Sequence, residues 1–177
     1  MNADADADVL ARYREGDASA FDELVKKYGP FIQRLCLRYV KDEEDAKDVA
    51  QRVFVRAFEK LDSFRGASSF RTWLYRIAVN MALNHVRGAP PIDPLPSEDV
   101  AAFTSSLRTS RLVAAEVWRK VSARLEQLPP KQRLVVELRV FHDLSFKEVA
   151  AIADSSEESA KVNFHHAIKT LREVLPR

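Results

Sequence analysis

Apolar side chains recur three or four residues apart along most of this chain, a spacing that predicts amphipathic helices. No window alternates between apolar and polar residues with turn signals at its ends, so strands are not expected. The pattern therefore predicts an all-α protein. Glycine and proline divide the helices from one another.

The first division falls in the N-terminal part of the chain. The pair Gly29-Pro30 predicts a break between one helix over 18–28 and another over 31–40. Asp42, followed by a second aspartate three residues later, predicts a capped helix that runs to about residue 61.

A loop over residues 64–69 follows, in which Gly66 tolerates unusual backbone angles. The next helix is predicted over 70–87. It should end at Gly88, because glycine commonly terminates helices.

The segment after Gly88 contains four of the eight prolines in the chain, together with serine and acidic residues. Such a composition predicts a flexible linker over 89–118, with the start of the next helix at its end. Two small helical domains, residues 1–88 and 119–177, are expected on either side.

The C-terminal domain carries a helix-turn-helix pattern. A helix predicted over 112–128 ends at Pro129-Pro130, and another is expected over 131–141. Two capping-box sequences follow ten residues apart, Ser145 to Glu148 and Ser155 to Glu158, each before a short apolar helical stretch. Two short capped helices of this kind are typical of DNA-binding motifs, although a generic helical hairpin has a similar pattern.

The charge distribution points to a polyanionic partner. The net charge is only +2, yet residues 63–88 hold four arginines and no acidic residue. Residues 119–177 hold eleven basic and eight acidic side chains, whereas the linker and residues 1–62 are net acidic. Two positive regions separated by an acidic one suggest two contacts with one nucleic acid.

The helix predicted over 70–87 has an apolar side and a polar side on a helical wheel. Thr72, Arg76 and Asn80 belong to the polar side, which offers cations and amides without a carboxylate. Phe64 and Phe70 are candidates for stacking on an unpaired base. A solvated polar face beside core aromatics is the alternative explanation.

The preceding helix has a second face of mixed character. Asp48, Gln51, Val55 and Phe58 share it, a combination that suits a protein partner. Alternatively, Phe58 packs under the N-terminal helices.

Other functions find little support. The single cysteine, Cys36, lies in an apolar pattern typical of a core and allows no internal disulfide, as expected in the cytoplasm. No apolar run is long enough for membrane insertion. The four histidines show no metal-ligand spacing, and no phosphate loop or catalytic triad is present. We therefore expect no metal, no cofactor and no enzymatic activity.

Several motifs together resemble one bacterial family. The N-terminal half contains REGDASAFDELVKKYGPFI, EEDAKDVAQRVFVRAFEKL and DSFRGASSFRTWLYRIAVNMALNHVR, and the C-terminal half contains LEQLPPKQRLVVELRVFHDLSFKEVAAIADSSEESAKVNFHHAIKTLRE. In order and spacing they resemble the extracytoplasmic-function (ECF) sigma factors. The resemblance implies a protein that binds core RNA polymerase and directs promoter recognition, DNA melting and transcription initiation.

The resemblance also implies roles for individual residues. The family's DA-x-D-x-x-Q helix docks on the polymerase clamp, which assigns that contact to Asp45, Asp48, Gln51 and Phe54. A loop and helix capture a flipped base of the melted non-template strand at the minus-ten element, which by position implies Phe64, Arg65, Ser68, Arg71, Trp73, Arg76 and Asn80. The second domain binds the minus-thirty-five duplex, with Lys161, His165 and Lys169 as its readers.

Three positions depart from the family pattern. Asn163 and His166 replace customary arginines of the recognition helix, and Arg52 replaces a customary glutamate after the clamp motif. Asn163 and His166 are expected to weaken phosphate anchoring or alter the base preference, whereas Arg52 reverses one charge at the polymerase contact. The resemblance further implies an anti-sigma factor as a partner. A one-component helix-turn-helix regulator that acts independently of polymerase is the alternative.

Overall fold

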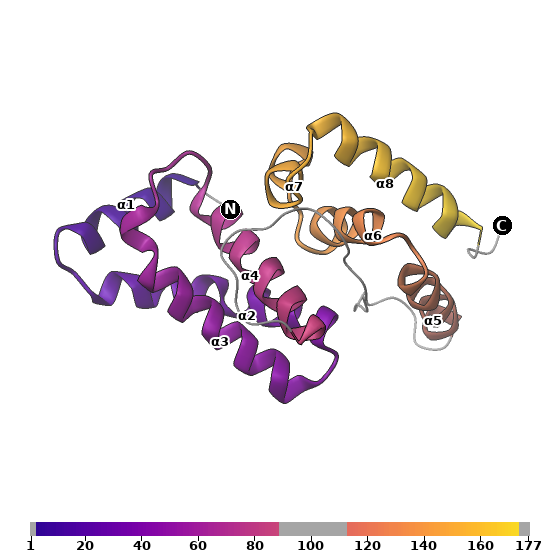
Figure 1. Cartoon of the computed structure of the whole chain (residues 1–177), viewed down its shortest axis with the longest axis horizontal. Helices are drawn as coiled ribbons and strands as arrows, with labels where there is room; N and C mark the ends of the chain where they lie inside the picture. Colours follow the sequence, from indigo (N-terminus) through magenta and orange to yellow (C-terminus); the bar gives the residue numbers. More distant parts are fainter. Residues whose placement is uncertain (1–2, 89–112, 174–177) are drawn as a thin grey trace. The chain divides into compact units, whose positions relative to one another are not determined.

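The computed structural model describes residues 3–88 and 113–173, with side chains from residue 6 and from residue 120 onward. Every regular element in these two ranges is a helix (Figure 1). The chain forms two compact units, with the division between Leu95 and Pro96. The all-α fold of two small helical units is thereby confirmed. Most of the linker predicted over 89–118 lies outside the described residues.

The described part of the N-terminal unit, residues 3–88, contains four α-helices. α2 (Ser19–Val40), α3 (Glu43–Glu59) and α4 (Phe70–Arg87) pack against one another, and α1 (Ala3–Arg14) packs on α2 (Figure 1). A 3₁₀ turn, Leu61–Ser63, follows α3. The cap of α3 is as predicted, because the Asp42 carboxylate accepts a hydrogen bond from the backbone N–H of Asp45 at 2.9 Å.

The predicted break at Gly29-Pro30 is wrong, because α2 runs through both residues as one helix. Leu24, Tyr28 and Ile32 are all buried and form one continuous apolar stripe across the proline. Burial of this stripe outweighs the loss of one backbone hydrogen bond, and Gly29 has no side chain to clash with the proline ring.

The central helix α4 ends as predicted, with Gly88 in the left-handed conformation at φ 64°. Its buried surface is wider than expected, since α2 and α3 both pack on it. Thr72, predicted on the polar side, is buried, and its hydroxyl forms a 2.8 Å hydrogen bond with that of Ser69. The buried side chains of α4 are Phe70, Thr72, Leu74, Tyr75, Ala78, Val79, Ala82 and Leu83.

We expect Cys36 not to react with Ellman's reagent at pH 8 in the native protein. Its side chain is fully buried, and burial raises the pKa of the thiol to about 12, so the reactive thiolate is scarce. Unfolding in urea should restore full reactivity. Reaction of the folded protein at the rate of a free thiol would contradict the core position.

Residues 113–173, the described part of the C-terminal unit, also contain four α-helices. α8 (Glu157–Arg172) packs against α5 (Val113–Glu126), α6 (Pro130–Val136) and α7 (Phe146–Ile152). Pro130 occupies the first turn of α6, where its missing N–H has no helical partner to lose. α6 continues into a π-helical stretch, Glu137–Phe141, which leads to the turn before α7.

Candidate nucleic-acid and polymerase interfaces

The loop between α3 and α4 is built on aromatic packing. Phe64 lies against Trp73 and Phe70, with ring centroids 5.2 and 5.9 Å apart, and Phe70 also lies 5.8 Å from Tyr28. Phe64 and Phe70 are 8% and 3% exposed. The prediction that these two rings stack on an unpaired base is therefore wrong for this conformation, because both rings belong to the core. Trp73 is the member of the cluster that remains partly exposed.

The rest of the loop faces solvent. Arg65 is exposed and Ser68 is partly exposed, and Gly66 adopts φ +73°, a left-handed conformation that favours glycine. The loop ends at Ser69, whose hydroxyl accepts a hydrogen bond from the backbone N–H of Thr72 at 3.1 Å and so caps α4.

A stripe along α4 continues from this loop. Trp73, Arg76 and Asn80 lie three and four residues apart, so they share one face of the helix, and all three are partly exposed. The carboxamide oxygen of Asn80 is buried and has no hydrogen-bond partner among the described residues. Arg71 lies off this stripe, with its guanidinium 5.7 Å from the centre of the Tyr75 ring.

The electrostatic character of this surface follows from its composition. No Asp or Glu lies between residues 63 and 88, so no carboxylate on the loop or on α4 opposes the four arginines. The loop and the α4 stripe together combine an aromatic edge, an amide and cations. Proteins that bind a single nucleic-acid strand use such groups: the aromatic ring stacks on a base, and the cations contact phosphates.

The solvent-exposed side of α3 bears the predicted polymerase contacts, with one correction. Asp45, Asp48 and Gln51 are exposed, but Phe54 is buried at 9% exposure and belongs to the core. Phe54 follows Gln51 by three residues, yet its side chain lies on the buried side of α3. Asp45 lies 3.7 Å from the imidazole of His85 at the end of α4.

Val55 and Phe58 extend the exposed surface of α3 with apolar area, at 58% and 48% exposure. Phe58 also packs edge-on against Tyr13 and Phe21, at centroid distances of 5.8 and 5.3 Å. Phe58 can therefore both pack under the N-terminal helices and contribute to a surface for a protein partner. One edge of its ring covers the N-terminal helices while the rest faces solvent.

The helix-turn-helix is formed by α7 and α8. The first predicted capping box is confirmed, with Ser145 and Glu148 bonding each other's backbone N–H groups. The second is wrong by one residue. Ser156, not Ser155, caps α8 and accepts a hydrogen bond from the backbone N–H of Ser159 at 3.0 Å.

The outward side of α8 carries the predicted duplex contacts. Lys161, His165 and Lys169 are all exposed, and Lys161 forms a 2.7 Å ion pair with Glu157 one turn earlier. The side chain of Asn163 is occupied within the helix, since its amide donates a 2.9 Å hydrogen bond to the Ser159 carbonyl.

α6 and the stretch that leads to the helix-turn-helix carry buried polar side chains that the sequence did not predict. Glu137 and His142 are 0% and 4% exposed, and their side chains are 3.0 Å apart. Arg133, one turn before Glu137, is also buried and donates to the carbonyl of Glu126 at 3.3 Å. Polar groups buried in this way normally have partners, and the available signal was that Arg133 and Glu137 flank the apolar run 134–136 one helical turn apart.

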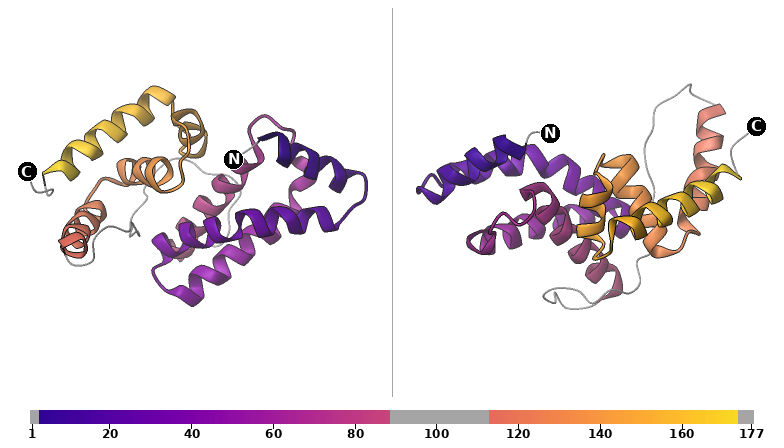
Figure 2. Two further views of the ribbon diagram at one scale, coloured as in Figure 1. Left: turned by 180° about the vertical axis from the view of Figure 1, so that it is seen from behind. Right: turned by 90° about the horizontal axis from the view of Figure 1, so that it is seen from above.

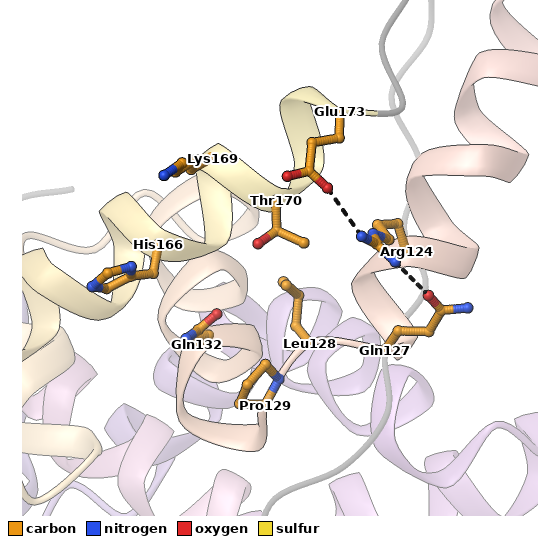
Figure 3. Close-up of a pocket in the computed structure, with 9 residues that line it drawn as sticks. All are labelled: Arg124, Gln127, Leu128, Pro129, Gln132, His166, Lys169, Thr170 and Glu173. Carbon is orange, nitrogen blue, oxygen red and sulfur yellow. Dashed lines mark hydrogen bonds and ion pairs between the residues drawn. The ribbon is translucent and has the colours of Figure 1, made fainter.

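A polar groove of about 480 Å³ runs between α8 and the α5–α6 turn (Figure 3). At one end, Arg124 forms a 3.0 Å ion pair with Glu173. Lys169 and His166 lie along the α8 side of the groove. Lys169 thus borders this groove as well as the outward side of α8.

Neither a metal site nor a membrane span is found in the parts of the chain that the structure describes. No three His, Cys, Asp or Glu side chains among them come close enough together to hold a metal ion. No helix there is both long and apolar enough to cross a bilayer.

Comparison with known proteins identifies the family. The model of Sigma-70 region 2 matches residues 24–89, and the model of Sigma-70 region 4 matches residues 118–171. The ECF RNA polymerase sigma-E factor of Escherichia coli K12 is 38% identical over 156 residues, which cover 82% of this chain and 81% of that protein. This chain belongs to the ECF family of RNA polymerase sigma factors.

The ECF sigma factor has further relatives in sequence and in structure. The RNA polymerase sigma-H factor of Pseudomonas aeruginosa is 36% identical over 162 residues, covering 86% of this chain and 84% of the relative. CnrH, solved in complex with the cytosolic domain of CnrY, matches with a TM-score of 0.73 at 25% identity over 96% of both chains. RpoE of Bartonella quintana shares the fold, with a TM-score of 0.67 at 21% identity over 89% of this chain and 97% of its own.

Family membership settles the general function. This sigma factor is a transcription initiation factor, and it directs core RNA polymerase to promoter DNA. The alternative of a one-component regulator is not favoured, because both halves of the chain match sigma regions in the expected order.

Proposed function

We propose a division of labour between three parts of this sigma factor. Residues 1–88 bind core polymerase and the minus-ten element, residues 119–177 bind the minus-thirty-five element, and residues 89–118 link them. The observation that carries the proposal is the acid-free surface of the α3–α4 loop and α4, which combines cations, an amide and an aromatic edge.

The minus-ten contact is assigned to this surface. Trp73 is the ring available for stacking on a flipped base, because it is partly exposed while its neighbours are buried. Arg65, Arg71 and Arg76 hold the phosphates of the non-template strand, and the partly exposed amide side chain of Asn80 contacts a base edge. Phe64 supports the loop from inside the core, and Ser68 lies beside the path of the strand.

The duplex contact is assigned to α8. Lys161 and His165 are one helical turn apart on its exposed side, close enough for both to reach one major groove. Lys169, two turns after Lys161, holds phosphate at the edge of the site. Because the amide of Asn163 is bonded to the Ser159 carbonyl, this residue contributes less to phosphate binding than an arginine at its position would.

The polymerase contact is assigned to Asp45, Asp48 and Gln51 on α3, without Phe54. We expect Asp48→Arg to weaken binding to core polymerase about tenfold or more, because a charge reversal at a complementary interface replaces attraction by repulsion. The affinity should be measured with fluorescently labelled sigma factor and purified core enzyme.

The matched control for this charge reversal is Asp22→Arg on α2, where the carboxylate is also exposed. We expect Asp22→Arg to bind core polymerase with nearly the affinity of the unaltered protein. Equal affinities of Asp48→Arg and the unaltered protein would contradict the assignment of α3.

An anti-sigma factor is the proposed regulatory partner. CnrH was solved with the cytosolic domain of CnrY, and RpoE of Bartonella quintana with the anti-sigma factor NepR. By analogy, this sigma factor acts in the cytoplasm and is held inactive by a protein that covers its polymerase-binding or DNA-binding surfaces.

A further inference from the structure

The end of α1 is joined directly to the α3–α4 loop. Arg14, in the last turn of α1, donates a hydrogen bond from Nη2 to the backbone carbonyl of Phe64 at 2.8 Å, across 50 residues of sequence. Both views of the unit show α1 beside this loop (Figures 1 and 2). A charged donor makes a stronger hydrogen bond than a neutral one. Phe64 is the residue at which the loop begins.

α1 itself is firmly attached to the rest of the unit. The Asp6 carboxylate is buried and accepts hydrogen bonds from the hydroxyl of Tyr28 and the ammonium of Lys27 on α2. Leu10 is buried, and Tyr13 packs on rings of α2 and α3. The guanidinium of Arg14 therefore extends from a fixed helix rather than from a loose terminus.

The loop has few other attachments. Its first residue, Phe64, is held by its ring and by a 3.0 Å hydrogen bond from its N–H to the Leu61 carbonyl. Arg65, Gly66 and Ala67 make no hydrogen bond, ion pair or ring contact with any described residue. The backbone orientation at Phe64, where the loop begins, is therefore set by three contacts. These are the packing of the Phe64 ring, the 3₁₀ turn before it and the hydrogen bond from Arg14.

We propose that Arg14 is a positioning residue for minus-ten recognition. It fixes the Phe64 carbonyl, and with it the start of the loop, in the orientation that receives the flipped base. The proposal rests on the assignment of this loop to base capture, made above. Arg14 acts through the loop backbone and not by touching DNA, so its contribution should exist only when a base is there to be captured.

The test measures open-complex formation by reconstituted holoenzyme on a promoter with an intact base at the captured position and on one with an abasic site there. We expect Arg14→Gln to lower the rate three- to tenfold on the intact promoter, as loss of one hydrogen bond implies. On the abasic promoter the same substitution should change the rate less than twofold. Affinity for core polymerase and for the minus-thirty-five duplex should be unchanged.

Two further variants test whether the effect comes from the position of the loop, or from the stability or the charge of α1. Arg14→Lys retains a charged donor and should stay within about twofold of the unaltered protein. Arg12→Gln removes the same charge from the same helix, but Arg12 pairs with Asp17 and Glu23 and does not reach the loop. Its rate on the intact promoter should be normal.

Two results would overturn the role of Arg14. An equal loss on intact and abasic promoters, with a reduced salt dependence, would make Arg14 a phosphate contact. An equal loss in Arg12→Gln would attribute the effect to α1 as a whole. The proposed base capture is tested separately, because it fails if the unaltered protein opens intact and abasic promoters at the same rate.

Discussion

Replacing Trp73 and Arg76 together by alanine is expected to lower promoter opening by a factor on the order of 100 while leaving polymerase binding intact. Stacking of one base on an aromatic ring contributes roughly 1–3 kcal/mol, and loss of a phosphate contact adds to this deficit. Permanganate reactivity of the minus-ten thymines measures opening directly. Normal reactivity in the double variant would contradict the assignment of the α4 stripe.

Because Trp73 also packs on Phe64 and Phe70, its removal loosens the loop, and the design has to separate this effect from stacking. Arg76→Ala alone leaves the aromatic cluster whole and should give a smaller, salt-dependent defect. Phe31 and Arg34 on α2 provide the control, since they form an aromatic–arginine pair of the same spacing, with the guanidinium 5.0 Å from the ring centre. Phe31→Ala with Arg34→Ala should open promoters normally.

The second large effect is expected in the C-terminal unit. Glu137→Ala should destabilise the helix-turn-helix by about 3–5 kcal/mol, because it removes the buried carboxylate that lies 3.0 Å from the buried imidazole of His142. Hydrogen exchange followed by mass spectrometry resolves the two units within the full chain. Protection should fall in α6, α7 and α8 and remain unchanged in α2, α3 and α4.

An exposed ion pair in the same unit provides the comparison. Lys161 and Glu157 are 2.7 Å apart but roughly half exposed, so Lys161→Ala should cost less than about 0.5 kcal/mol. Similar losses of protection in Glu137→Ala and Lys161→Ala would show that burial of Glu137 has little energetic consequence.

Features set by neighbouring residues were predictable from the sequence. The caps at Asp42 and Ser145 and the helix end at Gly88 depend on local hydrogen bonds or on one backbone conformation, and all three are confirmed. The predicted cap at Ser155 is displaced to Ser156, since adjacent serines offer nearly equivalent caps.

Features set by tertiary packing were not predictable. The helix α2 continues through Gly29-Pro30 because its apolar stripe is buried on both sides of the proline. Phe54 and Phe64 matched family positions by spacing, but spacing does not specify which side chains the neighbouring elements cover. The hydrogen bond from Arg14 to the Phe64 carbonyl joins residues 50 positions apart in sequence, and no local sequence pattern predicts it.

The most direct test of the account is run-off transcription with core RNA polymerase, with and without this sigma factor, on fragmented DNA of the genome that encodes it. We predict discrete transcripts that require the protein and whose start sites share two upstream elements. The absence of dependent transcripts, together with no measurable binding to core polymerase, would contradict the account.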